Sequence, residues 1–150
     1  MNKFMIIPVS RETEKEWAKM CVALFGKSFV ERLKEGRDKN FENEFVYMLN
    51  GEAVAFLNVS LRNDYVEGTS SNPVGYLEAI YVKPEFRYQG IARQMVEFAK
   101  QWSIENGCKE IASDCLIENE ESRRFHNKIG FEEANVIVCF TMELNNGLHN

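Results

Sequence analysis

The chain is poor in the residues that build metal centres and disulfide frameworks. Its 150 residues include two histidines and four cysteines, and no two cysteines form a Cys-x-x-Cys pair. The cysteines are too scattered for the ligand spacing of a zinc site. Because Cys21, Cys108 and Cys139 lie among apolar residues, we expect them to be buried, reduced thiols without a catalytic role. We assign no role to Cys115 and expect no metal cofactor.

The chain also lacks a long hydrophobic run and an excess of basic residues. The apolar run at residues 4–9 is too short for a signal-peptide core or a membrane span. We therefore expect an edge strand there, in a cytoplasmic protein without a membrane partner. With 23 acidic residues against 18 basic ones, the formal net charge is −5, which argues against a nucleic-acid partner and favours a cationic one.

What the chain does contain suits one globular domain over residues 1–150, since 45% of its residues are hydrophobic and 27% are charged. An Asn50-Gly51 pair between two apolar runs predicts a type I′ hairpin. Ser10 is a candidate cap for the first helix. Periodicity and turn signals predict helices over residues 12–24, 28–38, 91–106 and 118–128, and strands over residues 45–49, 53–61, 74–82, 110–114 and 136–144, before a frayed tail at residues 145–150.

One stretch carries a specific chemical signal. Residues 78–98 combine a buried strand, a loop marked by proline, and a turn of small residues that opens an amphipathic helix. Gly90 and Ala92 are small enough to let a phosphate approach the backbone, and the helix behind them points its first free N–H groups at it. The Gly-x-Gly-x-x-Gly spacing of a dinucleotide-binding turn is absent. The sequence therefore predicts a cradle for a pyrophosphate.

The pattern Arg/Gln-x-x-Gly-x-Gly/Ala, entered from an Ile-x-Val strand and a proline, resembles the acetyl-CoA signature of the GCN5-related N-acetyltransferase (GNAT) superfamily. This resemblance covers almost the whole chain. It implies an α/β (α+β) fold with a central mixed, mostly antiparallel sheet, splayed between two central strands, with helices on both faces. The gap would admit the pantetheine arm of acetyl-CoA as cosubstrate. The residues that the resemblance assigns to the cofactor are Ile80, Tyr81, Val82, Arg87, Tyr88, Gln89, Gly90, Ile91, Ala92, Asn119 and Ser122.

A second superfamily motif, Asn-x-x-Ala/Ser-x-x-Leu-Tyr-x-x-x-Gly-Phe, matches from Asn119 to Phe131 with one departure. His126 stands where the superfamily usually has a tyrosine, which is commonly assigned as the acid that protonates the leaving CoA thiolate. An imidazolium can do the same job, because the pKa of histidine lies close to neutral pH. The alternative is that His126 packs beside CoA or caps its helix.

A narrower resemblance comes from residues 62–69, residues 73–80 and the Ala112-Ser113-Asp114 triplet, together with Trp17, Cys21 and Phe25. These segments are similar to aminoglycoside 6′-N-acetyltransferases of the dimeric type. The resemblance implies acetylation of the 6′-amine of an aminoglycoside, with antibiotic resistance as the result. It also implies a homodimer formed through Val136 to Phe140, an apolar run that is long for an exposed edge.

A polycationic acceptor needs carboxylates and an aromatic wall. Two residues after Glu78 comes Ile80, so we expect both on one face of their strand, and Asp114 ends the neighbouring strand beside the splay. Either carboxylate can take the proton of the amine through water, and the N–H of Ile80 or Val82 can stabilise the oxyanion. The alternatives are a solvent-facing Glu78 and an Asp114 that caps a helix or ends a strand.

Three further residues are candidates for the acceptor site. Tyr65 and Phe25 are candidates for contacts with sugar rings, although an aromatic such as Phe25 on an amphipathic helix also suits a core. Glu133, after the Gly-Phe turn, adds negative potential at the cleft or solvates a hairpin.

Two other functions remain open at this point. The same chemistry can serve a polyamine or a protein amine as acceptor. A CoA-binding sensor without catalysis is the second, and the missing tyrosine is its only indication.

Overall fold

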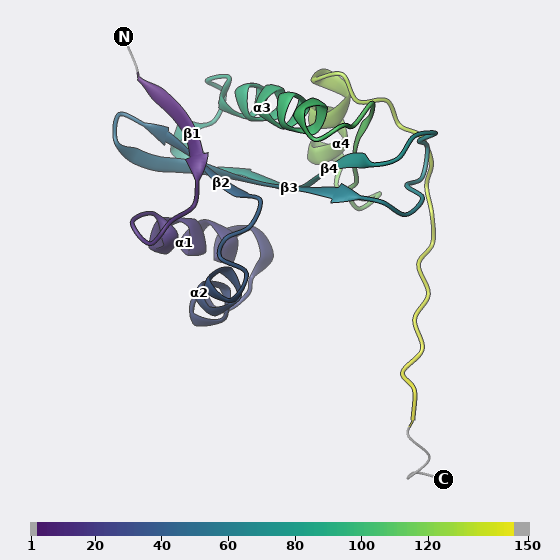
Figure 1. The fold of residues 1–150 in the computed structure, drawn as a ribbon, viewed down its shortest axis with the longest axis horizontal. Helices are drawn as coiled ribbons and strands as arrows, with labels where there is room; N and C mark the ends of the chain where they lie inside the picture. Colours follow the sequence, from purple (N-terminus) through teal and green to yellow (C-terminus); the bar gives the residue numbers. More distant parts are fainter. Residues whose placement is uncertain (1–2, 146–150) are drawn as a thin grey trace.

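A five-stranded sheet forms the centre of the molecule, in a computed structural model that describes residues 3–145 (Figure 1). The sheet order follows the chain, and the first four strands form an antiparallel meander, whereas the fifth is parallel to the fourth. The strands are β1 (Phe4–Pro8), β2 (Glu44–Leu49), β3 (Glu52–Arg62), β4 (Val74–Val82) and β5 (Ile111–Ser113). β1 lies at one edge, as predicted.

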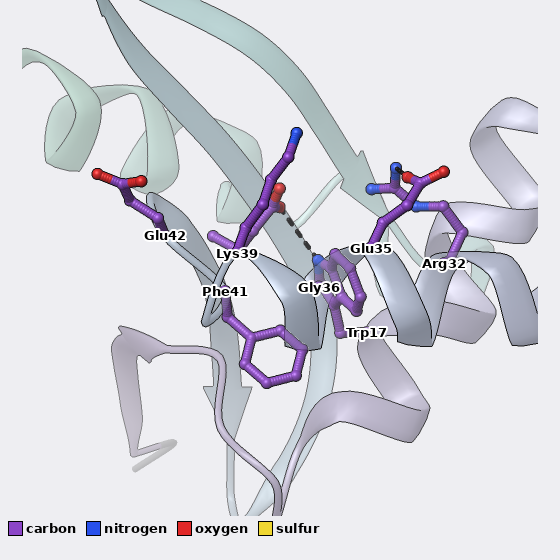
Figure 2. A pocket seen from close by; sticks show the side chains of 8 residues that line it. Trp17, Arg32, Glu35, Gly36, Lys39, Phe41 and Glu42 are labelled. Carbon is purple, nitrogen blue, oxygen red and sulfur yellow. Dashed lines mark hydrogen bonds and ion pairs between the residues drawn. The ribbon is translucent and has the colours of Figure 1, made fainter.

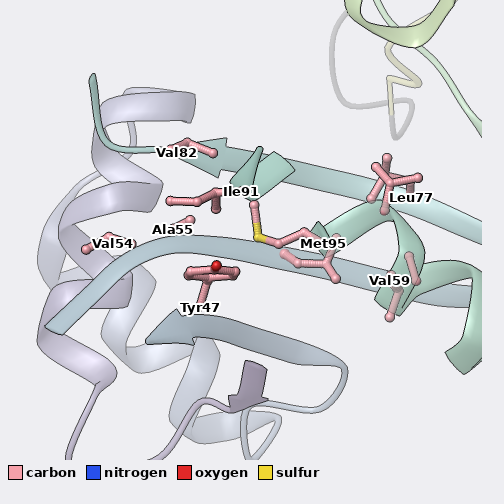
Figure 3. Close-up of a cluster of buried hydrophobic side chains, with 11 residues drawn as sticks. Tyr47, Val54, Ala55, Val59, Leu77, Val82, Ile91 and Met95 are labelled. Atoms are coloured by element: carbon pink, nitrogen blue, oxygen red, sulfur yellow. The ribbon is translucent and has the colours of Figure 1, made fainter. Parts of the chain in front are cut away.

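Helices cover both faces of the sheet. The central strands are apolar over most of their length, and successive side chains point to opposite faces, so both faces must be buried. One face packs against α1 (Glu14–Phe25) and α2 (Phe29–Asp38), and its core includes Trp17, Met20 and Phe56. The other face packs against α3 (Ile91–Glu105), whose Ile91 and Met95 enter the core (Figure 3). Phe125 of α4 (Glu120–Lys128) packs against the margin of that core. A short 3₁₀ turn, η1 (Pro84–Phe86), leads from β4 towards α3. Within residues 3–145, no helix is long and apolar enough to cross a membrane.

The predicted elements up to α4 are confirmed, with shifts of one or two residues at their ends. Ser28 caps α2, since its Oγ accepts a hydrogen bond from the N–H of Glu31 at 3.3 Å. The prediction that Ser10 caps the first helix is wrong: the cap position is Thr13, and α1 begins one residue later. Asn50 and Gly51 have φ angles of 50° and 85°, as a type I′ turn requires.

The predicted strand over residues 136–144 is wrong for the single chain. This segment has no strand pairing within the described residues, and it runs away from the sheet as an extended arm (Figure 1). The apolar run predicted a strand, but a strand also needs a neighbour that binds its N–H and C=O groups. Phe140 is 89% exposed. Cys139 is exposed as well, which contradicts its predicted burial, whereas Cys21 and Cys108 are buried as expected. Residues 146–150 of the predicted tail lie outside the described part.

A small polar cavity of about 40 Å³ lies between α1, α2 and β2 (Figure 2). Trp17 Nε1 donates to Glu44 Oε1 at 3.1 Å, and the Arg32 guanidinium lies 5.1 Å from the Trp17 ring centroid. Burial raises the pKa of Glu44 to about 7, although Trp17, Arg32 and Lys39 act in the opposite direction. The other polar side chains that line the cavity are Glu35 and Glu42. This cavity contains none of the predicted acceptor residues.

The raised pKa of Glu44 makes the stability of the fold depend on pH. The unfolded carboxyl ionises near its usual value of 4.5, but the folded one stays protonated up to about pH 7. This contribution to stability is complete below pH 4.5 and is lost as the pH rises through 7. At pH 8 we expect Glu44→Gln to be about 1–3 kcal/mol more stable than the wild type, and nearly equal to it at pH 4.5. Urea unfolding at both pH values measures this difference.

The control is Glu42→Gln, which removes an exposed carboxylate from the rim of the same cavity. We expect this variant to follow the wild type at both pH values. A Glu44→Gln variant that is less stable than the wild type at pH 8 would contradict the argument.

Candidate functional site

The two strands that the sequence predicted to splay do separate in the structure. β4 and β5 pair only through Gly75–Ile111, Tyr76–Ala112 and Leu77–Ser113. β4 continues to Val82, and within residues 3–145 it has no partner on that side beyond Leu77. The backbone of Ile80 to Val82 therefore forms a free strand edge, as expected for residues that bind an extended amide-containing ligand.

The strand carries a β-bulge at Glu78. Asn58 of β3 pairs with Ala79 and Val59 pairs with Leu77, so Glu78 is an extra residue opposite β3. The bulge reverses the alternation of side chains, and it makes one prediction wrong. Ile80 packs in the α3 core, whereas Glu78 bonds to Ser60, whose neighbour Val59 belongs to that core. Glu78 thus points to the opposite face from Ile80.

Glu78 and Asp114 lie in one polar network. The Arg62 guanidinium binds the Glu78 carboxylate at 2.8 Å and 3.1 Å, and the Ser60 hydroxyl donates to the same carboxylate. The Arg62 guanidinium carbon lies 3.4 Å from the centroid of the Tyr76 ring. The Tyr76 hydroxyl donates to Oδ2 of Asp114. The sequence predicted the two carboxylates as site residues. The structure joins them through Arg62 and Tyr76, which the sequence analysis did not name as site residues.

The predicted pyrophosphate cradle has the backbone geometry that the sequence indicated. Gly90 is the residue before α3 and has φ = 83°, and Tyr88 also has a positive φ of 62°. No side chain caps the helix, and its first turn contains no acidic residue, so its free N–H groups are available to an anion. Arg87 Nε donates to the carbonyl of Val82 at 2.8 Å, which ties the loop to the end of β4. Tyr88 and Gln89 are exposed beside it.

His126 is half-buried on α4, with both ring nitrogens engaged. Nδ1 lies 2.7 Å from the carbonyl oxygen of Ser122, which can only accept, so Nδ1 carries a proton. Nε2 lies 2.8 Å from Oγ of Ser113. The rings of Phe125 and Phe131 flank the imidazole. Nε2 can therefore pass a proton to the Ser113 hydroxyl only in the imidazolium form, in which both ring nitrogens are protonated.

The remaining predicted residues are more dispersed. Asn119 Oδ1 accepts from the N–H of Ser122 at 3.1 Å and caps α4. Phe25 is 47% exposed, so it is not a core residue, and Tyr65 is 75% exposed. The carboxylate of Glu133 is paired with Arg123 at 3.0 Å. Phe25, Tyr65 and Glu133 are thus on the surface, and in the described part of the chain none of them is hydrogen-bonded or ion-paired to Glu78 or Asp114.

This fold, with its parted strands and its turn before α3, matches a known family. The sequence profile of the acetyltransferase (GNAT) family covers residues 11–131. The chain belongs to this family. It is 33% identical, over 93% of its own length and 98% of the relative's, to an aminoglycoside N(6′)-acetyltransferase type 1 from Acinetobacter haemolyticus. Within the GNAT family it therefore groups with the aminoglycoside N(6′)-acetyltransferases.

A second relative gives a higher identity over a shorter stretch. The aminoglycoside N(6′)-acetyltransferase type 1 of Salmonella typhimurium is 41% identical over 96 residues, and the match spans 64% of this chain and 66% of that relative's length. Among solved structures, AAC(6′)-Iy in complex with the bisubstrate analog CoA-S-monomethyl-acetylneamine superposes with a TM-score of 0.87. That structure is 31% identical, and the match covers 95% of this chain and 99% of the other.

The cradle predicts a specific effect of a methyl group at Gly90. A Cβ built there meets no atom within 4 Å, so Gly90→Ala costs only the strain of a positive φ, on the order of 1 kcal/mol. The methyl group would however crowd the backbone that a phosphate must approach. We expect the affinity for CoA, measured by calorimetry, to fall about 10-fold.

Gly51→Ala is the matched control, because Gly51 has a φ of 85° and also meets no atom within 4 Å. It should lose similar stability and keep its affinity for CoA. Equal CoA affinity in both variants would rule out the cradle.

Proposed function

We propose that this protein transfers the acetyl group of acetyl-CoA to the 6′-amino group of an aminoglycoside and thereby confers resistance to the antibiotic. The observation that carries the proposal is the pair of carboxylates, Glu78 and Asp114, gathered where β4 and β5 part. The names of the relatives and the neamine analog bound by the solved structure support the same acceptor.

Acetyl-CoA would bind along the parted strands. The free edge from Ile80 to Val82 suits the amides of the pantetheine arm, and the N-terminus of α3 suits the pyrophosphate. Arg87, Tyr88, Gln89, Ile91 and Ala92 surround that turn, and Asn119 and Ser122 begin α4. No metal ion is needed for this chemistry, because the thioester is already an activated acyl group.

The acceptor amine must lose a proton before its nitrogen can attack the thioester carbonyl. Asp114 is the better base of the two carboxylates. Both oxygens of Glu78 are occupied by Arg62 and Ser60, whereas Asp114 is exposed and only its Oδ2 receives a hydrogen bond among the described residues. Glu78 then contributes negative charge near the ammonium group. Exposed Phe25 and Tyr65 suit contacts with the sugar rings, and Glu133 adds negative charge.

The transfer is direct, without an acyl-enzyme. The amine nitrogen forms a bond to the carbonyl carbon, and an N–H of the β4 edge, that of Ile80 or Val82, stabilises the oxyanion. The carbon–sulfur bond then breaks and the thiolate of CoA takes a proton. His126 in its imidazolium form can supply that proton from Nε2 to the Ser113 hydroxyl, which passes its own proton to the thiolate; Nε2 and Oγ are 2.8 Å apart, and the ring is left neutral. This route replaces the proton donor that the superfamily's usual tyrosine would provide.

We further propose that the enzyme acts as one cytoplasmic domain and as a homodimer. The arm at residues 136–145 supports the dimer, because Val138, Phe140 and Met142 alternate along extended backbone and are at least 74% exposed. A second copy of the chain can cover these side chains and pair with the arm's backbone. The homodimer implied by the resemblance would form through the same segment of the chain.

The reaction is tested by thiol release from acetyl-CoA with two aminoglycosides, one with a 6′-amine and one with a 6′-hydroxyl. We expect turnover only with the 6′-amine compound. Asp114→Asn should lower kcat about 100-fold or more, because it removes the base without changing the size of the side chain. Binding of CoA should be unchanged in this variant.

Other outcomes point to the other functions. Turnover of a polyamine or a protein amine, without turnover of either aminoglycoside, would replace the acceptor. Tight binding of CoA with no thiol release from any amine would indicate a sensor.

The dimer predicts that charge on the arm separates the copies. In the variant Val138→Lys/Phe140→Lys we expect a monomer by light scattering, where the wild type is a dimer, because two buried ammonium groups oppose association. Lys100→Ala, an exposed residue of α3, serves as the surface control and should remain dimeric. A monomeric wild type at all concentrations would exclude this assembly.

A further inference from the structure

Arg62 and Tyr76 form a bridge between the two carboxylates of the site. Glu78 and Arg62 form one end of the bridge, Tyr76 lies under the guanidinium, and Asp114 accepts a hydrogen bond from the Tyr76 hydroxyl. The members come from β3, β4 and the residue after β5. A displacement of any one member would therefore change the relative position of both carboxylates.

The Arg62 end of the bridge is held by two kinds of contact. Nη2 and Nε bind both oxygens of Glu78, so the guanidinium and the carboxylate face each other as a fork. The guanidinium carbon also lies 3.4 Å from the centroid of the Tyr76 ring, so the guanidinium stacks on that ring. Lysine has the same charge but neither the fork nor the flat face. The arrangement therefore depends on arginine, and charge alone is not sufficient for it.

The Tyr76 end is buried and aimed at Asp114. Tyr76 is only 6% exposed, and its pKa is raised, first by burial and then by the Asp114 carboxylate, so the hydroxyl remains a donor. This donor occupies Oδ2 of Asp114. The other oxygen, Oδ1, receives no hydrogen bond among the described residues.

We propose that Arg62 and Tyr76 are positioning residues for the acceptor amine. Tyr76 fixes which oxygen of Asp114 meets the amine, and Arg62 fixes the carboxylate of Glu78 at a set separation from it. This inference rests on the proposed function, since it names the residues that orient its base. Neither residue needs to touch the acceptor.

The kinetic consequence is specific. In Tyr76→Phe the ring and its contact with Arg62 remain and only the hydroxyl is lost. We expect kcat for the aminoglycoside to fall about 10-fold, with little change in KM for acetyl-CoA, because the base is misplaced while the cofactor site is intact. Arg62→Lys should give a loss of similar size.

A double-mutant cycle tests whether Tyr76 acts through Asp114. Tyr76→Phe should lower kcat/KM about 10-fold in the wild type and less than about 2-fold in the Asp114→Asn background. Arg62→Lys and Glu78→Gln form the second cycle, with the same expectation. An equal effect of Tyr76→Phe in both backgrounds would overturn the proposal.

The matched control is Tyr47→Phe. Tyr47 is also a strand tyrosine, it is 3% exposed, and its hydroxyl donates to Gln94 of α3, away from the carboxylates. We expect this variant to lose stability and to keep kcat/KM within about 2-fold. If kcat/KM fell as much in Tyr47→Phe as in Tyr76→Phe, the loss in Tyr76→Phe would be a general effect on the fold, and the proposal would be overturned.

The same variants separate this inference from the proposed function. A wild type that acetylates no amine would refute the function. The bridge is still measured then, by the coupling between Tyr76→Phe and Asp114→Asn in urea unfolding. Coupling outside experimental error supports the bridge, and additive effects overturn it.

Discussion

Three residue pairs join β4 to β5, and the chemistry proposed for this protein depends on the pairing ending there. At the paired end, Gly75 lies directly against Ser103 of α3, with no room for a Cβ, and its N–H binds the carbonyl of Glu110 at 3.0 Å. Beyond Leu77 the strands share no backbone hydrogen bond in the described structure. Close packing at one end and separation at the other create a wedge within a continuous sheet.

The bulge at Glu78 separates two functions of β4, that of its backbone edge and that of the Glu78 side chain. The backbone edge of β4 remains free for a cofactor, while the Glu78 side chain turns away from the α3 core to the face that carries Arg62 and Tyr76. Without the extra residue, Glu78 would follow the strict alternation of the strand and lie on the same face as Ile80. A single inserted residue thus allows one strand to serve both substrates.

Sequence reasoning succeeded where the determining chemistry is local. Asn50-Gly51 sets its own turn and Gly90 precedes the helix that it opens, although the local prediction of a Ser10 cap failed. It failed where the outcome depends on pairing between distant segments. The bulge is a shift in the pairing register between β3 and β4, which depends on two segments that are distant in the sequence.

The missed bridge has the same explanation. Arg62 belongs to a motif that the sequence singled out, but its position opposite Glu78 requires the register. In the sequence, Tyr76 could not be distinguished from an ordinary core aromatic of a buried strand. The strand prediction at residues 136–144 was wrong because it rested on an apolar run, which contains no information about what the segment pairs with.

The exposed arm also bears on how the chain behaves before it meets any partner. Alternating apolar side chains on unpaired, extended backbone form a strand donor, which can add to the open edge of any sheet that it encounters. Repulsion from a net charge of −5 is largely screened beyond about 8 Å at physiological salt, so it does little to keep two chains from approaching each other. A chain whose arm stays uncovered is therefore prone to aggregation, and covering the arm would remove that risk.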